Sequence, residues 1–295
     1  MFLIAGKDHT SLEAQRLRKP EWLKVKLPHS KEYKRVKGVL SSCGLHSVCQ
    51  EARCPNMTEC FHGGTATFLI LGDVCTRSCA YCNIRSGIPG LVDHEEPERL
   101  ADAVMKLGLQ YVVITSVTRD DLPDGGAELF ARCVESLRYR IPDCKVEVLI
   151  PDFRGSKDAL DRLIRAGPDV INHNMEVVRS LFTAVRPQGN YGTSLKLLQD
   201  ISGRRPPVIS KSGFMIGLGE TMDEILGLLA DLSSVDCKRV TIGQYQQPTR
   251  THWPVHKYYH PDEFEELKIR AGELGIRSVE AGPLVRSSYH AAHMK

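Results

Sequence analysis

The chain has 295 residues, of which 42% are hydrophobic and 25% are charged. This composition is ordinary for a globular protein and excludes collagen, coiled coil or disorder as the main state. The formal net charge of +3 is too small to indicate nucleic-acid binding. No apolar run approaches the roughly 20 residues that a membrane helix needs, so we expect neither a nucleic-acid nor a membrane partner.

The N-terminal region is basic. Residues 16–37 include nine Lys or Arg and only two acids, Glu21 and Glu32. Such a run predicts either a solvated, partly irregular extension or a surface that docks an acidic partner. The first residues have no apolar stretch after a basic start, and they carry Asp8 and Glu13. They therefore predict neither a secretory signal nor a transit peptide, and we expect a cytoplasmic protein.

From residue 67 onward, predicted strands and helices alternate. The helices place apolar residues on one face, as at Leu100, Val104 and Leu107. Strands are expected at residues 67–72, 111–115, 145–150, 170–174, 208–216, 239–243 and 276–281. Helices are expected at residues 97–107, 127–140, 157–166, 177–184, 194–201, 222–233 and 262–274. Six strand–helix units and a final strand predict an α/β fold with parallel strands, and a barrel or partial barrel fits the length best.

Ten cysteines need a chemical explanation, because a chain without an export signal is not expected to form disulfides. Seven of them lie between Cys43 and Cys82. The other three, Cys133, Cys144 and Cys237, are spread through the periodic part of the chain. We interpret those three as small hydrophobic residues of the core.

Cys75, Cys79 and Cys82 have the spacing C-x3-C-x2-C and follow the first predicted strand of the alternating region. Three thiols on one tight loop can hold one metal centre, and thiolates suit the irons of an iron–sulfur cluster. Three cysteines leave one iron of a cubane cluster open. In a parallel α/β barrel this loop lies at the carboxyl-terminal mouth, where active sites form.

A second triplet, Cys49, Cys54 and Cys60, has the spacing C-x4-C-x5-C and lies outside the barrel pattern. It predicts a second cluster. For the first triplet, the alternative is a structural zinc site that Cys49, Cys54 or Cys60 would complete, although zinc more often takes two paired C-x2-C elements. Cys43 precedes the triplet and is not predicted as a ligand.

The first triplet resembles the signature of the radical S-adenosylmethionine superfamily, with Tyr81 in its aromatic position. The resemblance implies a partial (β/α)6 barrel of the TIM type and a 4Fe–4S cluster on Cys75, Cys79 and Cys82. It also implies that S-adenosylmethionine binds the open iron and is cleaved to a 5′-deoxyadenosyl radical. Tyr81 would lie near the adenine, with an ordinary packing role as the alternative.

The two triplets together resemble the lipoyl synthase family. Further matching segments are residues 115–126, 172–176, 211–213, 217–221, 243–245 and 286–291. The likeness extends from about residue 19 to residue 291. Phe214, Ile216 and Gln246 depart from the family pattern, and they bear on the fit of the substrate rather than on the reaction.

The resemblance implies a sulfurtransferase that inserts sulfur at carbons six and eight of an octanoyl chain bound to a lysine of a carrier domain. The second 4Fe–4S cluster would be the sacrificial sulfur donor. The implied partners are the octanoylated lipoyl domains of 2-oxo acid dehydrogenases, the glycine cleavage H protein, and an electron donor such as flavodoxin or ferredoxin. The alternatives are another sulfur-inserting radical enzyme, similar to biotin synthase, and a non-catalytic zinc or electron-transfer protein.

The resemblance also implies three regions: an extension at residues 1–62 with the auxiliary-cluster cysteines, a barrel core at residues 63–282, and a C-terminal segment at residues 283–295. In that segment the family motif is Arg286-Ser287-Ser288-Tyr289. We expect the Ser288 oxygen, rather than that of Ser287, to be the fourth ligand of the auxiliary cluster and to act in the reaction. Arg286 would steady that oxygen.

Polar residues at the predicted strand ends are candidates for binding S-adenosylmethionine, since its ammonium needs an acid or amide and its carboxylate needs a base. Each of them has a structural hydrogen-bonding role as the alternative. The candidates are Thr115, Ser116, Asn172, Asn174, Glu176, Lys211 and Gln244. His173 is expected to be structural. Arg119, Asp120 and Asp121 could instead form an ion-pair set within their loop.

Overall fold

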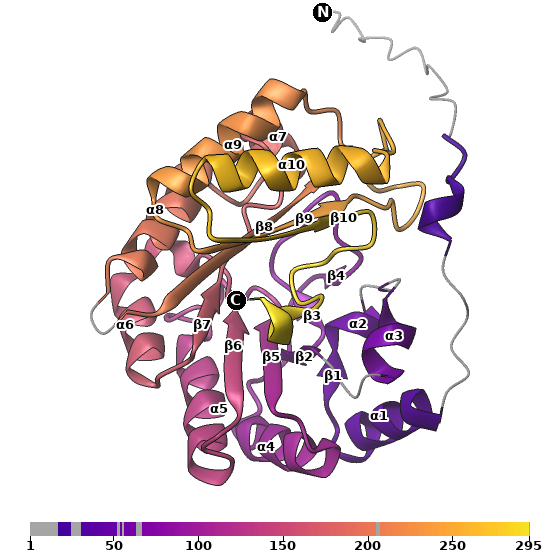
Figure 1. Ribbon diagram of the computed structural model, residues 1–295. Helices are drawn as coiled ribbons and strands as arrows, with labels where there is room; N and C mark the ends of the chain where they lie inside the picture. Colours follow the sequence, from indigo (N-terminus) through magenta and orange to yellow (C-terminus); the bar gives the residue numbers. More distant parts are fainter. Residues whose placement is uncertain are drawn as a thin grey trace, which may run out of the picture.

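The fold is known from a computed structural model, which describes residues 17–24, 31–51, 54, 56–62, 67–204 and 207–294. Its centre is an eight-stranded sheet in the order β1-β2-β5-β6-β7-β8-β9-β10, which curves into an open barrel (Figure 1). The strands of this sheet are β1 (His46–Ser47), β2 (Thr67–Ile70), β5 (Tyr111–Ser116), β6 (Lys145–Leu149), β7 (Val170–Asn172), β8 (Ile209–Ile216), β9 (Arg239–Gln244) and β10 (Ser278–Gly282). A separate two-stranded ribbon joins β3 (Val74–Cys75) to β4 (Arg85–Ser86).

The strands from β2 to β10 all pair in parallel, so their carboxyl ends gather at one mouth. The register opposes Ile70 to Ser116 and Thr115 to Leu149. All four residues of β2 are buried, which is the pattern of a parallel strand covered on both faces. The expected partial barrel is confirmed, and each of the seven predicted strands overlaps an observed one.

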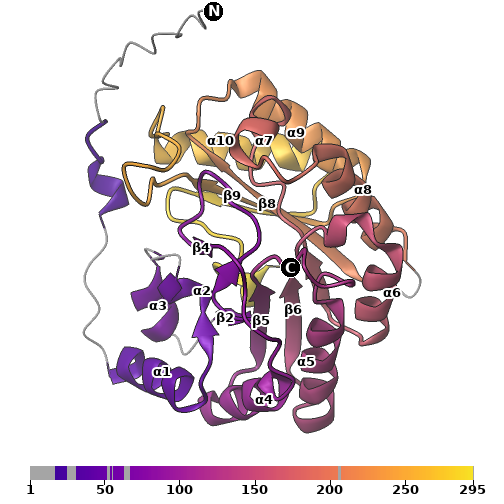
Figure 2. The same ribbon diagram turned by 180° about the vertical axis from the view of Figure 1, so that it is seen from behind.

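The helices cover the outer face of the barrel (Figures 1 and 2). They are α4 (Glu96–Leu107), α5 (Ala127–Arg140), α6 (Lys157–Arg165), α7 (Arg179–Val185), α8 (Tyr191–Ser202), α9 (Met222–Ser234) and α10 (Pro261–Glu273). Their ends follow from local chemistry: Gly108 ends α4 in the left-handed conformation, and a reciprocal capping box of Thr221 and Glu224 begins α9. Helix α8 starts three residues earlier than predicted because the Asn190 side chain accepts a hydrogen bond from the Thr193 N–H.

The apolar faces of these helices pack on the strands. Leu100, Val104 and Leu107 of α4 are almost fully buried, as their periodicity predicts. Cys133, Cys144 and Cys237 are also buried, which confirms their role in the core. Gly126 precedes α5 with a φ of 91°, and a Cβ there would lie 2.3 Å from the Leu71 side chain. A glycine is therefore required where the loop after β2 passes α5.

The described residues of the N-terminal extension include regular secondary structure. They form a 3-10 turn (Glu21–Leu23) and helices α1 (Lys31–Ser42), α2 (Val48–Glu51) and α3 (Met57–His62). Strand β1 joins the barrel sheet by antiparallel pairing with β2. Val36 and Leu40 bury the inner face of α1, a packing that its high lysine content obscures in the sequence.

The predicted region boundary between residues 62 and 63 adjoins residues 63–66, which lie outside the described part of the chain, as do Arg16 and Lys26 of the basic run. Within the described part, none of the helices has the length and apolar character needed to cross a bilayer.

Candidate functional site: two cysteine triplets at the barrel mouth

The first triplet lies on the loop that follows β2. Cys75 is the last residue of β3, and its carbonyl accepts a hydrogen bond from Gly87 N–H at 2.9 Å. The Cys75 sulfur faces two backbone N–H groups, those of Arg77 at 3.4 Å and Thr118 at 3.3 Å. Donors aimed at sulfur stabilise a thiolate, which is the form that binds metal.

The same loop is held from the other side of the mouth. Ala80 N–H donates to the Val185 carbonyl at 2.8 Å, and Trp253 N–H donates to the Ala80 carbonyl at 2.9 Å. His252 Nε2 lies 2.9 Å from the Cys82 carbonyl oxygen. The backbone around the three thiols is therefore fixed by segments that are distant in sequence.

Two thiols of this loop, Cys79 and Cys82, are costly to ionise without a metal. Burial raises the pKa of Cys79. Burial and the neighbouring thiols of the triplet together raise the pKa of Cys82 to about 12. Three mutually repelling thiolates need a cation between them. The donor set thus fits an iron–sulfur cluster, whose irons compensate the thiolate charges.

A cavity of about 150 Å³ opens beside the triplet. Five of the residues predicted to bind S-adenosylmethionine line it: Tyr81, Thr115, Ser116, Asn174 and Glu176. Three buried polar atoms at this cavity have no hydrogen-bond partner among the described residues. They are Ser116 Oγ, Asn174 Oδ1 and Arg186 Nε. Buried polar groups are normally satisfied, so these atoms fit a polar ligand such as the cofactor.

Glu176 and Arg186 give the cavity an acid and a base. Burial raises the pKa of Glu176, and Arg186 opposes that shift. Glu176 has a φ of 70°, an uncommon backbone conformation for this residue type. Arg186 is held by the carbonyl oxygens of Asn174 and Met175, both at 3.2 Å. The pair suits a ligand that carries both an ammonium and a carboxylate group.

Three other predicted cofactor residues lie elsewhere. Lys211 forms an ion pair with Glu147 at 2.9 Å, and neither side chain has any exposed surface. Asn172 donates to the same carboxylate at 3.3 Å. Gln244 donates to three backbone carbonyls and accepts from Tyr259 N–H. None of the three lines the cavity, and their contacts are those of the structural role that the sequence left as the alternative.

His173 is structural, as expected. Its Nδ1 lies 2.9 Å from the Ile150 carbonyl and its Nε2 lies 2.9 Å from Ser194 Oγ. Burial lowers its pKa to about 4, so the ring is neutral at pH 7. In that form Nδ1 donates to the carbonyl and Nε2 accepts from the serine.

The second triplet lies on α2, α3 and the turn between them. Cys49 is buried in α2, and its carbonyl accepts from Cys54 N–H at 2.9 Å. Cys60 lies in α3. Burial, together with the neighbouring Cys49 and Cys54, raises the pKa of Cys60 to about 12. The three thiols are therefore near enough to interact, and they too fit a metal cluster better than free thiolates.

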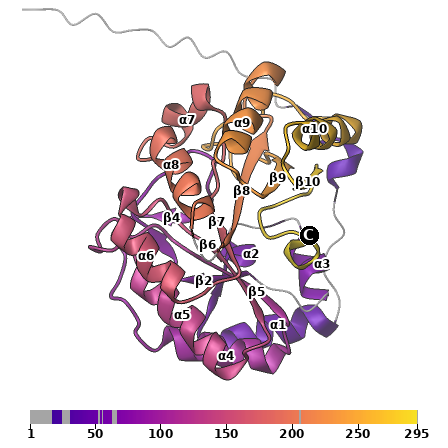
Figure 3. The same cartoon turned by 60° about the vertical axis from the view of Figure 1, so that its left-hand side comes forward.

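The C-terminal segment runs from β10 back to the second triplet, and Figure 3 shows its end beside α3. Asn56 Nδ2 donates to the Leu284 carbonyl at 2.5 Å, and Tyr289 Oη donates to Glu59 at 3.0 Å. A Cβ on Gly243 would lie 2.2 Å from the Val285 carbonyl oxygen, so a glycine in β9 is needed for this approach.

The motif residues 286–289 divide between the two sites. Arg286 is near Cys54, since each group shifts the pKa of the other. Ser288 Oγ accepts from Thr67 Oγ1 at 2.8 Å. Ser287 Oγ instead accepts from Asn174 Nδ2 at 2.6 Å, on the cofactor-cavity side.

Cys43 directly follows α1, is buried, and its sulfur lies 3.7 Å from Lys106 Nζ. No three His, Cys, Asp or Glu side chains of the described ranges gather as they would around a single metal ion.

Sequence reasoning missed Arg186 and the pairing of Arg77 with Asp120 and Asp152. Arg119 pairs with Asp121 as suggested, whereas Asp120 pairs with Arg77. Arg186 lies ten residues beyond Glu176 with no motif around it. The position of Arg77 inside the cysteine motif is the sequence feature that could have indicated its role.

Comparison with known proteins decides the family. The radical SAM superfamily model matches residues 69–232, and the model of the N-terminal domain of lipoyl synthase matches residues 6–54. A lipoyl synthase of Alcanivorax borkumensis is 51% identical over 93% of this chain and 85% of its own length. That of Klebsiella pneumoniae is 50% identical over 99% of this chain and 91% of its own. The chain belongs to the lipoyl synthase family.

Solved structures support the fold. Methylornithine synthase has a TM-score of 0.54 and 12% identity, covering 85% of this chain and 71% of its own. The hydrogenase maturase HydG has a TM-score of 0.55 and 12% identity, covering 86% of this chain and 56% of its own. As a lipoyl synthase family member, the protein is a radical SAM sulfurtransferase that uses S-adenosylmethionine and two 4Fe–4S clusters. The biotin synthase-like and non-catalytic alternatives are set aside.

Proposed function

We propose that this chain inserts sulfur at carbons six and eight of a protein-bound octanoyl-lysine, with the two cysteine triplets in different roles. Cys75, Cys79 and Cys82 would hold the cluster that binds S-adenosylmethionine. Cys49, Cys54 and Cys60, with Ser288 as fourth ligand, would hold the auxiliary cluster. When bound, these groups supply a 5′-deoxyadenosyl radical that abstracts hydrogen from unactivated carbons, and the sulfur that replaces it.

The residues of the cavity would bind and orient S-adenosylmethionine. Glu176 and the Asn174 amide suit its ammonium group, and Arg186 suits its carboxylate. Tyr81 would cover the adenine from the cluster loop. Thr115 and Ser116, at the end of β5, offer hydroxyl groups to the remaining polar atoms. Enclosure at the mouth would also keep water away from the reacting carbon.

At the second triplet, Ser288 is supported by its place in the segment that contacts α3. Its oxygen is a harder ligand than a thiolate and matches iron–sulfur chemistry less well. Such a ligand would release its iron more readily when the cluster gives up sulfur. Arg286, near Cys54, would steady the anionic oxygen.

One observation carries this proposal. The hydrogen bond from Asn174 to Ser287 joins a residue of the cofactor cavity to the segment that reaches the second triplet. The cofactor cavity and the second triplet would then share one mouth, where a single substrate carbon could face each of them in turn. A long flexible chain end fits such an arrangement, because it can present first one carbon and then the other.

The carrier proposed to present that chain is an octanoylated lipoyl domain of a 2-oxo acid dehydrogenase or the glycine cleavage H protein. A small reductant protein, such as flavodoxin or ferredoxin, would supply the electron. We propose that the reaction takes place in the cytoplasm, where thiols stay reduced and free to bind iron.

The test uses reconstituted protein under anaerobic conditions with S-adenosylmethionine, a reductant and an octanoyl-lysine peptide. Peptide mass reports zero, one or two sulfurs gained, and 5′-deoxyadenosine reports cofactor cleavage. We expect Cys79→Ala to abolish cleavage and Cys54→Ala to retain cleavage without sulfur insertion. Cys43→Ala serves as the matched control and should retain both. Equal loss of cleavage in folded Cys79→Ala and Cys54→Ala would refute the division of roles.

A further inference from the structure

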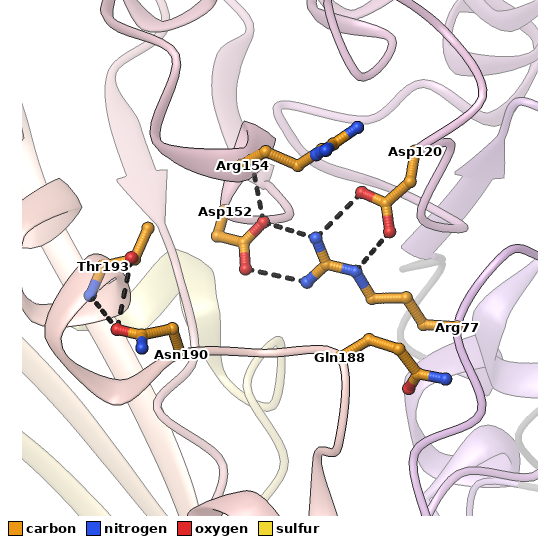
Figure 4. Close-up of a pocket in the computed structure, with 7 residues that line it drawn as sticks. All are labelled: Arg77, Asp120, Asp152, Arg154, Gln188, Asn190 and Thr193. Atoms are coloured by element: carbon orange, nitrogen blue, oxygen red, sulfur yellow. Dashed lines mark hydrogen bonds and ion pairs between the residues drawn. The ribbon is translucent and has the colours of Figure 1, made fainter.

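Arg77, on the loop of the first triplet, forms ion pairs with two carboxylates, those of Asp120 and Asp152. Arg77, between Cys75 and Cys79 in the sequence, is only 7% exposed. Each of these carboxylates accepts two hydrogen bonds from the Arg77 guanidinium, one at each oxygen (Figure 4). Asp120 accepts from Nε at 2.6 Å and Nη2 at 2.8 Å. Asp152 accepts from Nη1 and Nη2, both at 2.7 Å.

The two carboxylates come from separate loops of the barrel mouth. Asp120 follows β5 and Asp152 follows β6. The Asp120 N–H also donates to Thr76 Oγ1 at 3.1 Å, and Thr76 N–H donates to the Thr118 carbonyl at 3.0 Å. Bidentate charge-assisted bonds are among the strongest in proteins. Arg77 therefore fastens the cysteine loop to both neighbouring loops.

Arg77 is also part of a wall between two spaces. On one side is the cavity lined by Cys75, Cys79 and Cys82. On the other is an outer pocket of about 340 Å³, which Figure 4 shows. A further contact ties Arg77 to the metal-binding thiols, since its backbone N–H donates to the Cys75 sulfur at 3.4 Å. Arg77 lines the same cavity as the three thiols, so its charge belongs to the surroundings of the cluster site.

We propose that Arg77 is a positioning residue whose charge favours one-electron reduction of the cluster on Cys75, Cys79 and Cys82. Asp120 and Asp152 hold Arg77 in place and partly oppose its effect. Reduction adds one negative charge, which a nearby cation stabilises and nearby carboxylates destabilise. Hydrogen bonding, charge and burial around a cluster set its reduction potential. This inference rests on the cysteine assignment of the proposed function.

The experiment is a redox titration of the reconstituted protein, following the electron paramagnetic resonance signal that changes when S-adenosylmethionine is added. Arg77→Gln should shift the midpoint potential to more negative values. Asp120→Asn should shift it to more positive values, because it removes an opposing charge and keeps an amide near Arg77. A role in loop order alone would not give shifts of opposite sign.

Arg77→Lys separates charge from geometry. Lysine keeps the charge but cannot reproduce the two-sided fork. Its midpoint potential should stay closer to the wild-type value than that of Arg77→Gln, while its S-adenosylmethionine affinity falls. Iron content and circular dichroism show which variants are folded and loaded.

Shifts of the same sign in Arg77→Gln and Asp120→Asn, or no shift in either, would overturn the proposal. If the Arg77 variants do not assemble a cluster, Asp120→Asn decides alone, and an unchanged or more negative potential overturns it. Cys79→Ala should remove the signal that responds to S-adenosylmethionine. Its persistence there would refute the cysteine assignment itself, which distinguishes that failure from failure of the charge effect.

Discussion

Asn174 donates a hydrogen bond to Ser287 at 2.6 Å and a second one to Glu176 at 3.0 Å. Asn174 follows β7 and lines the cofactor cavity, whereas Ser287 lies in the segment that contacts α3. The Asn174 amide therefore forms hydrogen bonds both to the acid of the cavity and to the C-terminal segment. Adjacent serines in the motif face different partners, and this gives them separable roles.

We expect Ser288→Ala to assemble both clusters and to cleave S-adenosylmethionine, but to lose at least about tenfold in lipoyl product. Ser287→Ala should instead weaken S-adenosylmethionine binding by about threefold to tenfold, the value of one hydrogen bond. Product mass and cofactor affinity check the two variants side by side. Normal sulfur insertion by Ser288→Ala, with a block in Ser287→Ala, would mean that the wrong serine was chosen.

The Lys211–Glu147 pair predicts a large loss of stability without loss of cofactor binding. Lys211→Met should lower the free energy of unfolding by about 3–5 kcal/mol, because it leaves the Glu147 carboxylate buried without its cation. The double variant Lys211→Met/Glu147→Leu should recover most of that loss. Denaturant titration measures both. If the folded double variant binds S-adenosylmethionine more weakly than the wild type, the prediction that Lys211 contacts the cofactor is correct.

His173 predicts a pH dependence of stability. Its pKa is about 4 in the folded protein against 6.5 for the free side chain, so the unfolded chain binds the proton more readily. Stability is therefore lost as the pH falls below about 6.5, by about 2 kcal/mol between pH 7 and pH 5. Unfolding experiments at the two pH values should show a smaller difference for His173→Gln. An equal difference in both proteins would assign the effect to other groups.

The basic face of α1 predicts little effect on carrier binding. Arg35 Nη2 donates to the Lys106 carbonyl in the last turn of α4, which leads into the amino-terminal end of β5. Helix α1 thus lies at the end of the barrel opposite the mouth (Figure 1). We expect a Lys31/Lys34/Lys37→Gln variant to bind an octanoylated carrier with the wild-type dependence on salt. A reduced salt slope would restore the docking interpretation of the basic run.

The alternating part of the sequence predicted its elements well because each buries one apolar face or run. Residues 127–140 match α5 at both ends, since periodicity and chain breaks coincide there. The N-terminal extension was harder to predict. Its helices α2 and α3 are too short for a periodic signal, and the two-residue strand β1 is formed only by pairing with β2.

The site divides in the same way. Cysteine spacing predicted the ligands because a compact loop brings its own thiols together. Strand-end polarity placed Asn174 and Glu176 at the cavity but could not separate them from Lys211, whose side chain meets Glu147 within the barrel. Arg186 directly follows α7, and the fold brings it to the cavity. Its spacing from the other site residues in the sequence does not indicate this proximity.

The sheet has two edges, β1 and β10, and remains open between them. In the described part of the chain, that side is crossed by the C-terminal segment, with Thr67 bonded to Ser288 and Asn56 bonded to the Leu284 carbonyl. A closed eight-stranded cylinder would fill this side with backbone. Because the wall is incomplete, α2 follows the edge strand β1 directly and carries Cys49 at this open edge of the sheet.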